Sequence, residues 1–437
     1  MARLTGFLLF LLFIEDKGAA YNTKPSTFGA PLAWLNVLVQ PTAIKLRPFD
    51  LIMLVILVVA SLRGGRGRAP QVKPMKSTIW LILATTIVCE AYGLARGGDF
   101  RHASWQTYLI LSTVLVVFTV AATCRTVADF RALAHWLIAA SIYRGMMCWL
   151  SYFTWGRDVV GTGGGYLTTH DDTVLWVVSI LVLIVDTVDR WSAKAILRNG
   201  AVIAFLIVAI QWNSRRLAWV SLAMGLVVLY VLTPQGPAKR RINRVGRFAL
   251  PLLLLYVVVG WGRGNRIFLP LRSLSTVSTQ EDASTLARNA ENLGLIFTAN
   301  NSGVALGTGW GRPYVPLTMK YDISGFELWQ YVPHNSILAL LAFTGFIGFA
   351  GFWLAFPTAV FLSARVARLS ADAKIRGVAM IGAAQLVVCA NQLYGDMGIF
   401  FPKPMYMMAV SYAIALRMPG LAGVWSAPSN QSARMSV

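Results

Sequence analysis

A histidine and several arginines are the residues of this chain whose types could perform chemistry together. His334 is one of only four histidines and stands at the start of an apolar run. Arg215, Arg216 and Arg288 are predicted to lie on the same side of a membrane as His334. A neutral imidazole can accept a proton from an attacking hydroxyl, and planar guanidinium groups can hold a pyrophosphate through paired hydrogen bonds. These residue types together indicate chemistry on a lipid-linked anion.

Plainer interpretations exist for these positions. Pro333 fits the first turn of a helix, and a helix N-terminus attracts anions and disfavours a charged imidazole, which favours a neutral His334. The alternative is a polar residue that caps a short interfacial helix. Arg215 and Arg216 follow a plausible N-cap, Asn213-Ser214, and open a predicted membrane helix. The alternative is that both arginines only snorkel to the interface.

Arg288 is expected on an outward-facing helix over residues 281–298, whose apolar residues recur at a helical period. Asp282 or Ser284 could cap the start of this helix. Arg288 lies off the apolar stripe, where it could bind an anion or pair with Glu291 one turn later. Arg312, which follows a glycine-rich turn, is a candidate of similar status.

The glycine-rich turn covers residues 303–311 and lacks the Lys-Ser/Thr ending of a nucleotide-binding P-loop. We therefore expect no nucleotide there. Gly307 and Gly309 would permit tight turns and close packing, and Asn335 is a further candidate for structural support. The alternative is contact between a phosphate and the backbone N–H groups of the turn.

Composition places these residues in a membrane protein. Of the 437 residues, 56% are hydrophobic and 13% are charged, whereas soluble domains have about 45–50% apolar and about 25% charged residues. Much of the formal net charge of +21 follows from topology, because cytoplasmic loops collect Lys and Arg, and we expect no nucleic-acid partner. The cysteines show neither a disulfide framework nor a metal-binding spacing. They are Cys89, Cys124, Cys148 and Cys389.

Hydropathy predicts an all-α polytopic fold with about twelve transmembrane helices. The first apolar segment could be a signal peptide, but Glu15-Asp16-Lys17 is a poor cleavage context, so we expect an uncleaved helix. The predicted spans are approximately 3–14, 48–62, 77–95, 105–123, 131–152, 173–189, 196–212, 215–232, 247–262, 346–367, 375–395 and 400–418.

The basic loops orient these spans. Placing both termini in the cytoplasm puts the Lys- and Arg-rich loops on that side, as the positive-inside rule requires. The long polar stretch that holds the candidate residues then faces the periplasm and forms short helices of its own. The predicted regions are an N-terminal bundle of about nine spans over 1–262, the periplasmic region over 263–344, membrane helices over 345–418 and a disordered tail over 419–437.

Two further charged groups have open interpretations. Arg144 and Glu90 are predicted at similar depth inside the bundle, where they could form a structural ion pair or serve a function. His170-Asp171-Asp172 on an outer loop could bind a cation, although two adjacent acids and one histidine are a weak signal.

The order and spacing of three motifs over residues 200–355 resemble the O-antigen ligase superfamily, which also includes bacterial polysaccharide polymerases. The first motif is Ser214-Arg215 at the start of a membrane helix. The second joins Arg288 to the later sequence Leu306-Gly307-Thr308-Gly309. The third is His334-Asn335-Ser336-Ile337-Leu338 followed by Gly345-Phe346-Ile347-Gly348.

The resemblance implies a metal-independent, inverting glycosyltransferase with a GT-C-like fold, without cofactors, in the bacterial inner membrane. Its donor would be a glycan on undecaprenyl pyrophosphate, and its acceptor a sugar hydroxyl of lipid A–core. By the same resemblance, Arg215 and Arg288 would bind the pyrophosphate and His334 would orient or deprotonate the acceptor hydroxyl. Arg216 beside Arg215 is a departure that leaves the choice between them open.

Two alternatives accompany this expectation. A polysaccharide polymerase would use the same donor but a lipid-linked acceptor, and the motifs do not separate it from a ligase. A transporter or flippase for lipid-linked sugars would suit many spans with interior charges, but no inverted repeat is evident.

Overall fold

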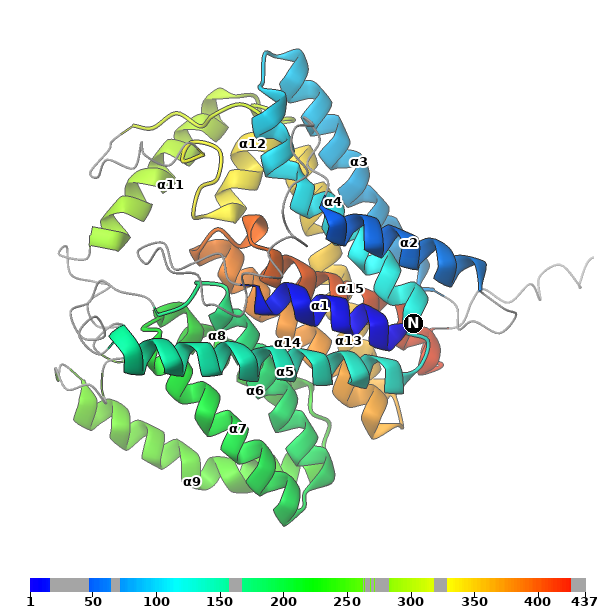
Figure 1. Ribbon diagram of the computed structural model, residues 1–437, viewed down its shortest axis with the longest axis vertical. Coiled ribbons are helices and arrows are strands. Elements are labelled where there is room, and N and C mark those ends of the chain that lie inside the picture. Colours follow the sequence, from blue (N-terminus) through cyan, green and yellow to red (C-terminus); the bar gives the residue numbers. More distant parts are fainter. Residues whose placement is uncertain are drawn as a thin grey trace, which may run out of the picture.

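The computed structural model describes residues 1–15, 47–63, 71–156, 167–261, 283–317 and 328–425, together with positions 263, 268 and 271. Within these residues the chain forms helices and no β-strand, so the all-α prediction is confirmed. Figure 1 shows the helices gathered around a central group, with α11 and α12 on one side and α6, α7 and α9 on the other.

The helices of the N-terminal part each coincide with a predicted span. They are α1 (Ala2–Ile14), α2 (Pro48–Leu62), α3 (Lys73–Ala95), α4 (Phe100–Thr123), α5 (Val127–Ser151), α6 (Asp172–Arg190), α7 (Ala193–Trp212), α8 (Arg216–Leu232) and α9 (Pro237–Gly260). A π-helical turn (Tyr152–Gly156) extends α5. α9 begins ten residues before its predicted span, because Pro237 occupies its first turn and the basic residues that follow are helical.

The C-terminal part comprises α11 (Ala283–Asn301), α12 (Ser336–Trp353), α13 (Ala355–Leu369), α14 (Ala373–Gly395), a 3₁₀ turn η5 (Gly398–Phe400) and α15 (Pro402–Leu421). α11 confirms the helix predicted over 281–298, and Asp282 lies outside the described residues. The tail prediction was wrong for its first residues. α15 continues through Leu421, and the Arg365 guanidinium lies over the Trp425 ring.

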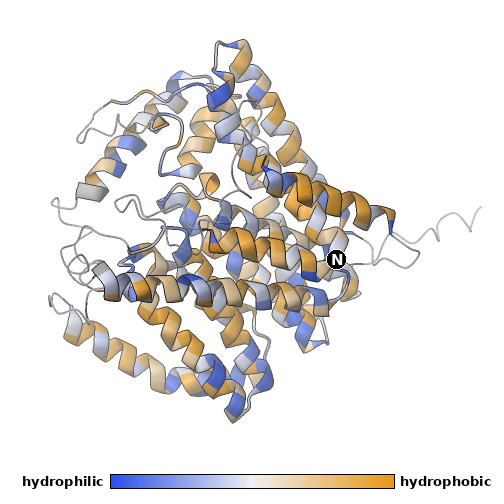
Figure 2. Cartoon of the chain, in the orientation of Figure 1, coloured by the Kyte–Doolittle hydropathy of each residue, from blue (hydrophilic) through white to orange (hydrophobic). Residues whose placement is uncertain are grey.

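Among the described residues, length and composition identify six helical segments able to cross a membrane: α3, α4, α7, α9, α14 and the joined α12–α13. α1, α2 and α8 are apolar but shorter. α9 buries none of the residues in its most apolar window, whereas α4 buries 83%. An apolar helix with exposed side chains is suited to lipid contact. Figure 2 shows the hydrophobic helix α9 at the edge of the bundle.

The glycine-rich turn packs between α3 and α12. Helix α12 breaks at Gly345, with φ 58° and ψ −162°. The freed carbonyls of Ala342 and Phe343 accept hydrogen bonds from Thr308 N and Gly309 N at 3.1 and 2.8 Å. A Cβ on Gly309 would lie 2.2 Å from the Cα of Gly93, so this close approach requires glycine.

These contacts also decide the role of the turn. The backbone N–H groups of residues 307–311 all donate to protein acceptors, which are carbonyls except for the Gln106 side chain that accepts from Gly311 N. These N–H groups are therefore occupied, and the structure does not support the alternative in which they contact a phosphate. Gly307 and Gly309 serve packing.

Candidate functional site

The candidate histidine is held by an acid from α11. His334 Nδ1 lies 3.2 Å from Oε2 and 3.3 Å from Oε1 of Glu291. The backbone N–H of His334 also donates to Glu291 Oε2 at 2.8 Å. The Glu291 side chain is 7% exposed and the His334 side chain 35%. A carboxylate on Nδ1 favours the tautomer in which that nitrogen carries the proton, so Nε2 can act as the base.

The start of α12 differs from its prediction. Asn335 is the N-cap, and its Oδ1 accepts from Leu338 N at 3.1 Å. His334 therefore precedes the helix, and Pro333 does not occupy its first turn. The reason is that an Asn side chain caps a helix well, whereas His334 makes its backbone and ring contacts to Glu291. Asn335 thus has the structural role expected of it.

Asp396, directly after α14, joins several candidate residues. Its Oδ2 lies 2.6 Å from His170 Nδ1, and its Oδ1 lies 3.9 Å from a terminal nitrogen of Arg288. The next residue, Met397, donates its N–H to the carbonyl of His334 at 2.6 Å. The turn after α14 therefore connects the histidine segment to Arg288 and to the loop before α6.

The charges around Asp396 determine its ionisation. Burial alone would raise the pKa of its carboxyl group. The hydrogen bond from His170 and the charges of His170, Arg215 and Arg288 oppose burial and hold this pKa below its usual range. Asp396 is therefore a carboxylate at neutral pH, surrounded by cationic and hydrogen-bonding groups.

Arg215 and Arg216 occupy different environments. Arg215 is 9% exposed and its charge acts on Asp396, whereas Arg216 is only partly buried. Arg215 is also the N-cap residue of α8, so the expected cap by Asn213-Ser214 was wrong. Asn213 instead ends α7, and its Oδ1 accepts from the backbone N–H groups of residues 167 and 168.

Arg144 and Glu90 do not form the expected ion pair. Arg144 binds Asp172 instead, with Nε 3.0 Å from Oδ1 and a terminal nitrogen 2.6 Å from Oδ2. Both side chains are fully buried. Glu90 lies beside Thr107 of α4. The prediction failed because α3 packs against α4 and α12, whereas α5 packs against α1 and α6.

The acids beside His170 are neutralised by resident cations. Lys403 Nζ lies 2.6 Å from Asp172 Oδ1 and 3.2 Å from Asp171 Oδ1. With Arg144 on the other side of Asp172, these carboxylates fix the loop that carries His170 and are not placed to bind a cation. Among the described residues, no three His, Cys, Asp or Glu side chains come together as metal ligands.

Arg312 follows Gly311, whose backbone bonds to Asp99 before α4 and to the Gln106 side chain within α4. Gln106 also donates to the carbonyl of Tyr331, three residues before His334. The structure thus brings Arg215, Arg288 and His334 together around Asp396, and a role for Arg312 stays a prediction.

Asp396, Glu291 and His170 are the members that sequence reasoning missed or treated as marginal. One signal was available for Asp396, which is the only charged residue between the last two predicted spans. Glu291 was considered only as a partner of Arg288, and His170 only as part of a cation site. Comparison with known proteins adds no assignment, because no protein-family model and no curated protein matches this chain.

Helix ends supply the remaining electrostatics. His170, Arg215 and His334 each lie within two residues of the N-terminal end of a helix, namely α6, α8 and α12. Helix N-termini carry partial positive charge and bind anions. The arrangement can therefore hold an anionic group near Arg215 and Arg288 while a base stands close by on the His334 segment.

The lowered pKa of Asp396 predicts how stability depends on pH. A carboxyl group whose pKa is depressed by folding stabilises the protein above its unfolded pKa of about 3.9 and loses this contribution as pH falls through the folded value. Wild type should therefore unfold at a higher temperature than Asp396→Asn at pH 5, and the difference should shrink below about pH 4. Thermal unfolding in detergent checks this. A difference that grows on acidification would contradict it.

Proposed function

We propose that this protein is a membrane glycosyltransferase that moves a glycan from undecaprenyl pyrophosphate to a sugar hydroxyl of lipid A–core, as an O-antigen ligase does. One observation carries the proposal. The turn at Asp396 contacts the segment of the His334–Glu291 pair on one side, and the charges of Arg215 and Arg288 act on Asp396 itself. The proposed location is the bacterial inner membrane, with this site facing the periplasm. The basic loops at the other ends of the helices support that orientation.

In this proposal His334 is the general base. The acceptor hydroxyl attacks the anomeric carbon and gives its proton to Nε2 of His334, while the bond from that carbon to the pyrophosphate oxygen breaks. Glu291 orients the ring and stabilises the imidazolium that forms. The pyrophosphate departs on its lipid with the bonding electrons, and inversion follows from a single displacement.

The leaving group needs stabilisation more than it needs an acid, because pyrophosphate departs readily as an anion. Arg215 and Arg288 would hold it, aided by the N-terminal ends of α6 and α8. Asp396 would position the two arginines, since a carboxylate between them offsets their mutual repulsion until the donor binds. No metal or nucleotide is required by this scheme.

The test is a reconstituted transfer reaction. Purified protein would be mixed with an undecaprenyl-pyrophosphate glycan and lipid A–core, without nucleotide and with EDTA, and the products separated on a gel. Glycosylated lipid A–core is the expected product. Longer lipid-linked chains with unmodified core would identify a polymerase instead, and a folded preparation without either product would favour a transporter.

Arg288→Ala should lower kcat/KM for the lipid-linked donor by about 10–100-fold, because a hydrogen bond to a charged group contributes roughly 1.5–3 kcal/mol. Arg288→Lys should recover part of this loss, since it restores the charge but not the planar fork. Arg244→Ala, on the basic N-terminal half of α9, is the control and should stay near wild type. Equal losses in the Arg288 and Arg244 variants would contradict a specific role for Arg288.

A further inference from the structure

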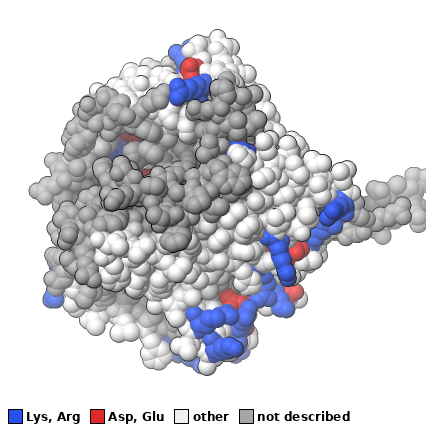
Figure 3. Space-filling model, viewed as in Figure 1, with Lys and Arg blue, Asp and Glu red and all other residues white. Residues whose placement is uncertain are grey.

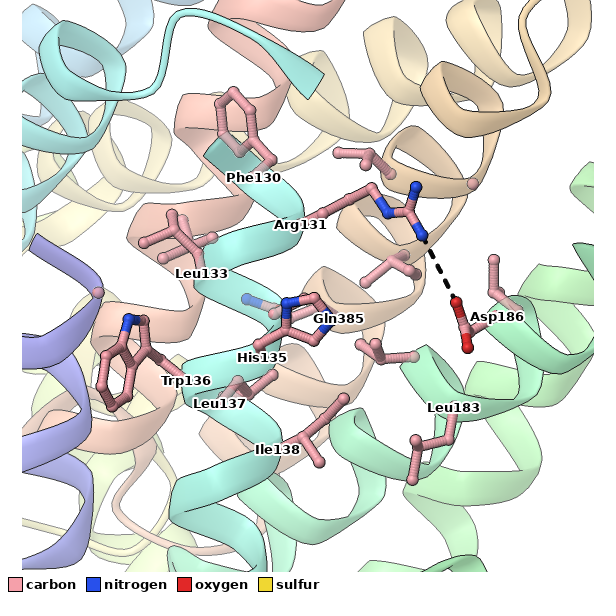
Figure 4. A pocket seen from close by; sticks show the side chains of 18 of the residues that line it. Phe130, Arg131, Leu133, His135, Trp136, Leu137, Ile138, Leu183, Asp186 and Gln385 are labelled. Carbon is pink, nitrogen blue, oxygen red and sulfur yellow. Dashed lines mark ion pairs between the residues drawn. The ribbon is translucent and has the colours of Figure 1, made fainter. Parts of the chain in front are cut away.

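A separate cavity lies at the other end of the bundle from His334. It has a volume of about 500 Å³ and is lined by α1, α5, α6, α7, α14 and α15. This volume falls within the roughly 300–1,000 Å³ of typical ligand sites. Its walls are mostly apolar, with Phe10, Leu133, Trp136, Leu183 and Val410 among them. Figure 4 shows the part formed by α5, α6 and α14.

One end of the cavity carries a cluster of arginines. Arg131, Arg190 and Arg198, from three different helices, converge on the single carboxylate of Asp186. The nitrogen–oxygen distances are 3.7, 2.8 and 3.1 Å. Figure 4 marks the pair between Arg131 and Asp186.

This cluster has more cations than its acids can neutralise. Arg131, Arg190, Arg198 and Lys374 line the cavity beside only two acids, Asp186 and Asp189. Arg131 remains 35% exposed and Arg198 56%, so both can reach a further anion. Figure 3 shows Lys and Arg side chains gathered along the lower edge of the molecule, with Asp and Glu side chains among them.

The position of the cluster along the helices matches a lipid headgroup. Helix α6 runs from Asp172, beside the candidate site, to Arg190 in the cluster. Helix α14 runs in the opposite direction, from its first turn with Lys374 to the turn at Asp396. The cations therefore stand at the opposite membrane boundary, where the basic loops gather. The apolar walls extend from there toward the middle of the bundle, in the direction that an acyl chain takes from its phosphate.

We propose that this cavity binds one anionic phospholipid of the cytoplasmic leaflet. Its phosphate would contact Arg131, Arg190 and Arg198, and an acyl chain would lie between α5 and α14. An apolar space of this size gains dispersion contacts only when a hydrophobic group fills it. The excess of arginine selects an anionic headgroup over a zwitterionic one. This inference does not depend on the transfer reaction.

The test compares two lipids on delipidated full-length protein in detergent, by native mass spectrometry and thermal unfolding. Phosphatidylglycerol should bind with a stoichiometry of one and raise Tm by roughly 2–4 °C, whereas phosphatidylcholine should do neither. Arg131→Gln with Arg198→Gln should weaken phosphatidylglycerol binding about 30-fold, at roughly fivefold for each arginine. Arg244→Gln with Arg247→Gln, on α9, is the matched control and should bind as wild type does.

A cavity-filling variant tests the acyl-chain part of the site. Ala134→Phe occupies the apolar space and leaves every charge in place, so it should also lose the bound lipid. Equal binding of the two lipids, or binding that neither the arginine variant nor Ala134→Phe reduces, would overturn the proposal. Size-exclusion chromatography identifies any variant that fails to fold, and the other variant then decides.

Discussion

His334→Ala should lower the transfer rate by about 10²–10⁴-fold, the usual contribution of a positioned general base. The variant should retain the fold, because His334 precedes α12 and its ring is partly exposed. The backbone bonds that hold this segment, from Met397 N to the His334 carbonyl and from His334 N to Glu291, do not depend on the ring. The measurement is single-turnover transfer to lipid A–core, with donor binding measured separately.

Two variants separate catalysis from folding in this experiment. Glu291→Gln keeps a hydrogen-bonding group beside Nδ1 but removes its charge, so it should lower the rate less than His334→Ala and alter its pH dependence. His135→Ala is the control, because His135 lines the cavity at the other end of the bundle from His334. A wild-type rate in His334→Ala would exclude a role for this histidine as base.

Features of the fold that depend on local sequence could be predicted. Long apolar runs become helices because a buried or lipid-facing backbone must satisfy its own hydrogen bonds. The amphipathic repeat over 281–298 gives α11, and Gly345 interrupts α12 because only glycine readily takes its positive φ. The count of about twelve spans stays a prediction, since length and composition support six in the part of the chain that the structure describes.

The partners of the candidate residues could not be predicted in the same way. His170 and Asp396 are 226 positions apart in the chain and meet because α6 packs against α14. The sequence predicts how deep each residue lies in the membrane, but it does not predict which helices are neighbours. Similar depth therefore suggests a pair between Arg144 and Glu90, although the carboxylate partner of Arg144 is Asp172.

The buried charge cluster at Asp172 gives the largest expected effect on stability. Asp172→Asn should destabilise the protein by about 3–5 kcal/mol, the usual cost of leaving a buried charge without its partner. Asp172 accepts from both Arg144 and Lys403, and its side chain is fully buried, so the substitution removes the carboxylate charge that these two cations share. The midpoint of unfolding in detergent, followed by circular dichroism, measures this loss.

Two companion variants show whether charge compensation is the cause. Adding Arg144→Met to Asp172→Asn removes one of the uncompensated cations, and Lys403 keeps Asp171, so the double variant should be more stable than Asp172→Asn alone. Glu90→Gln should have little effect, because Glu90 is not the partner of Arg144. If Glu90→Gln were the destabilising change and Asp172→Asn neutral, the pairing predicted from depth would be correct and the packing of α5 against α6 described above would be wrong.

Because the cluster at Asp172 also fixes the loop that carries His170, loss of the cluster should reduce transfer as well, but only in proportion to the displacement of that loop.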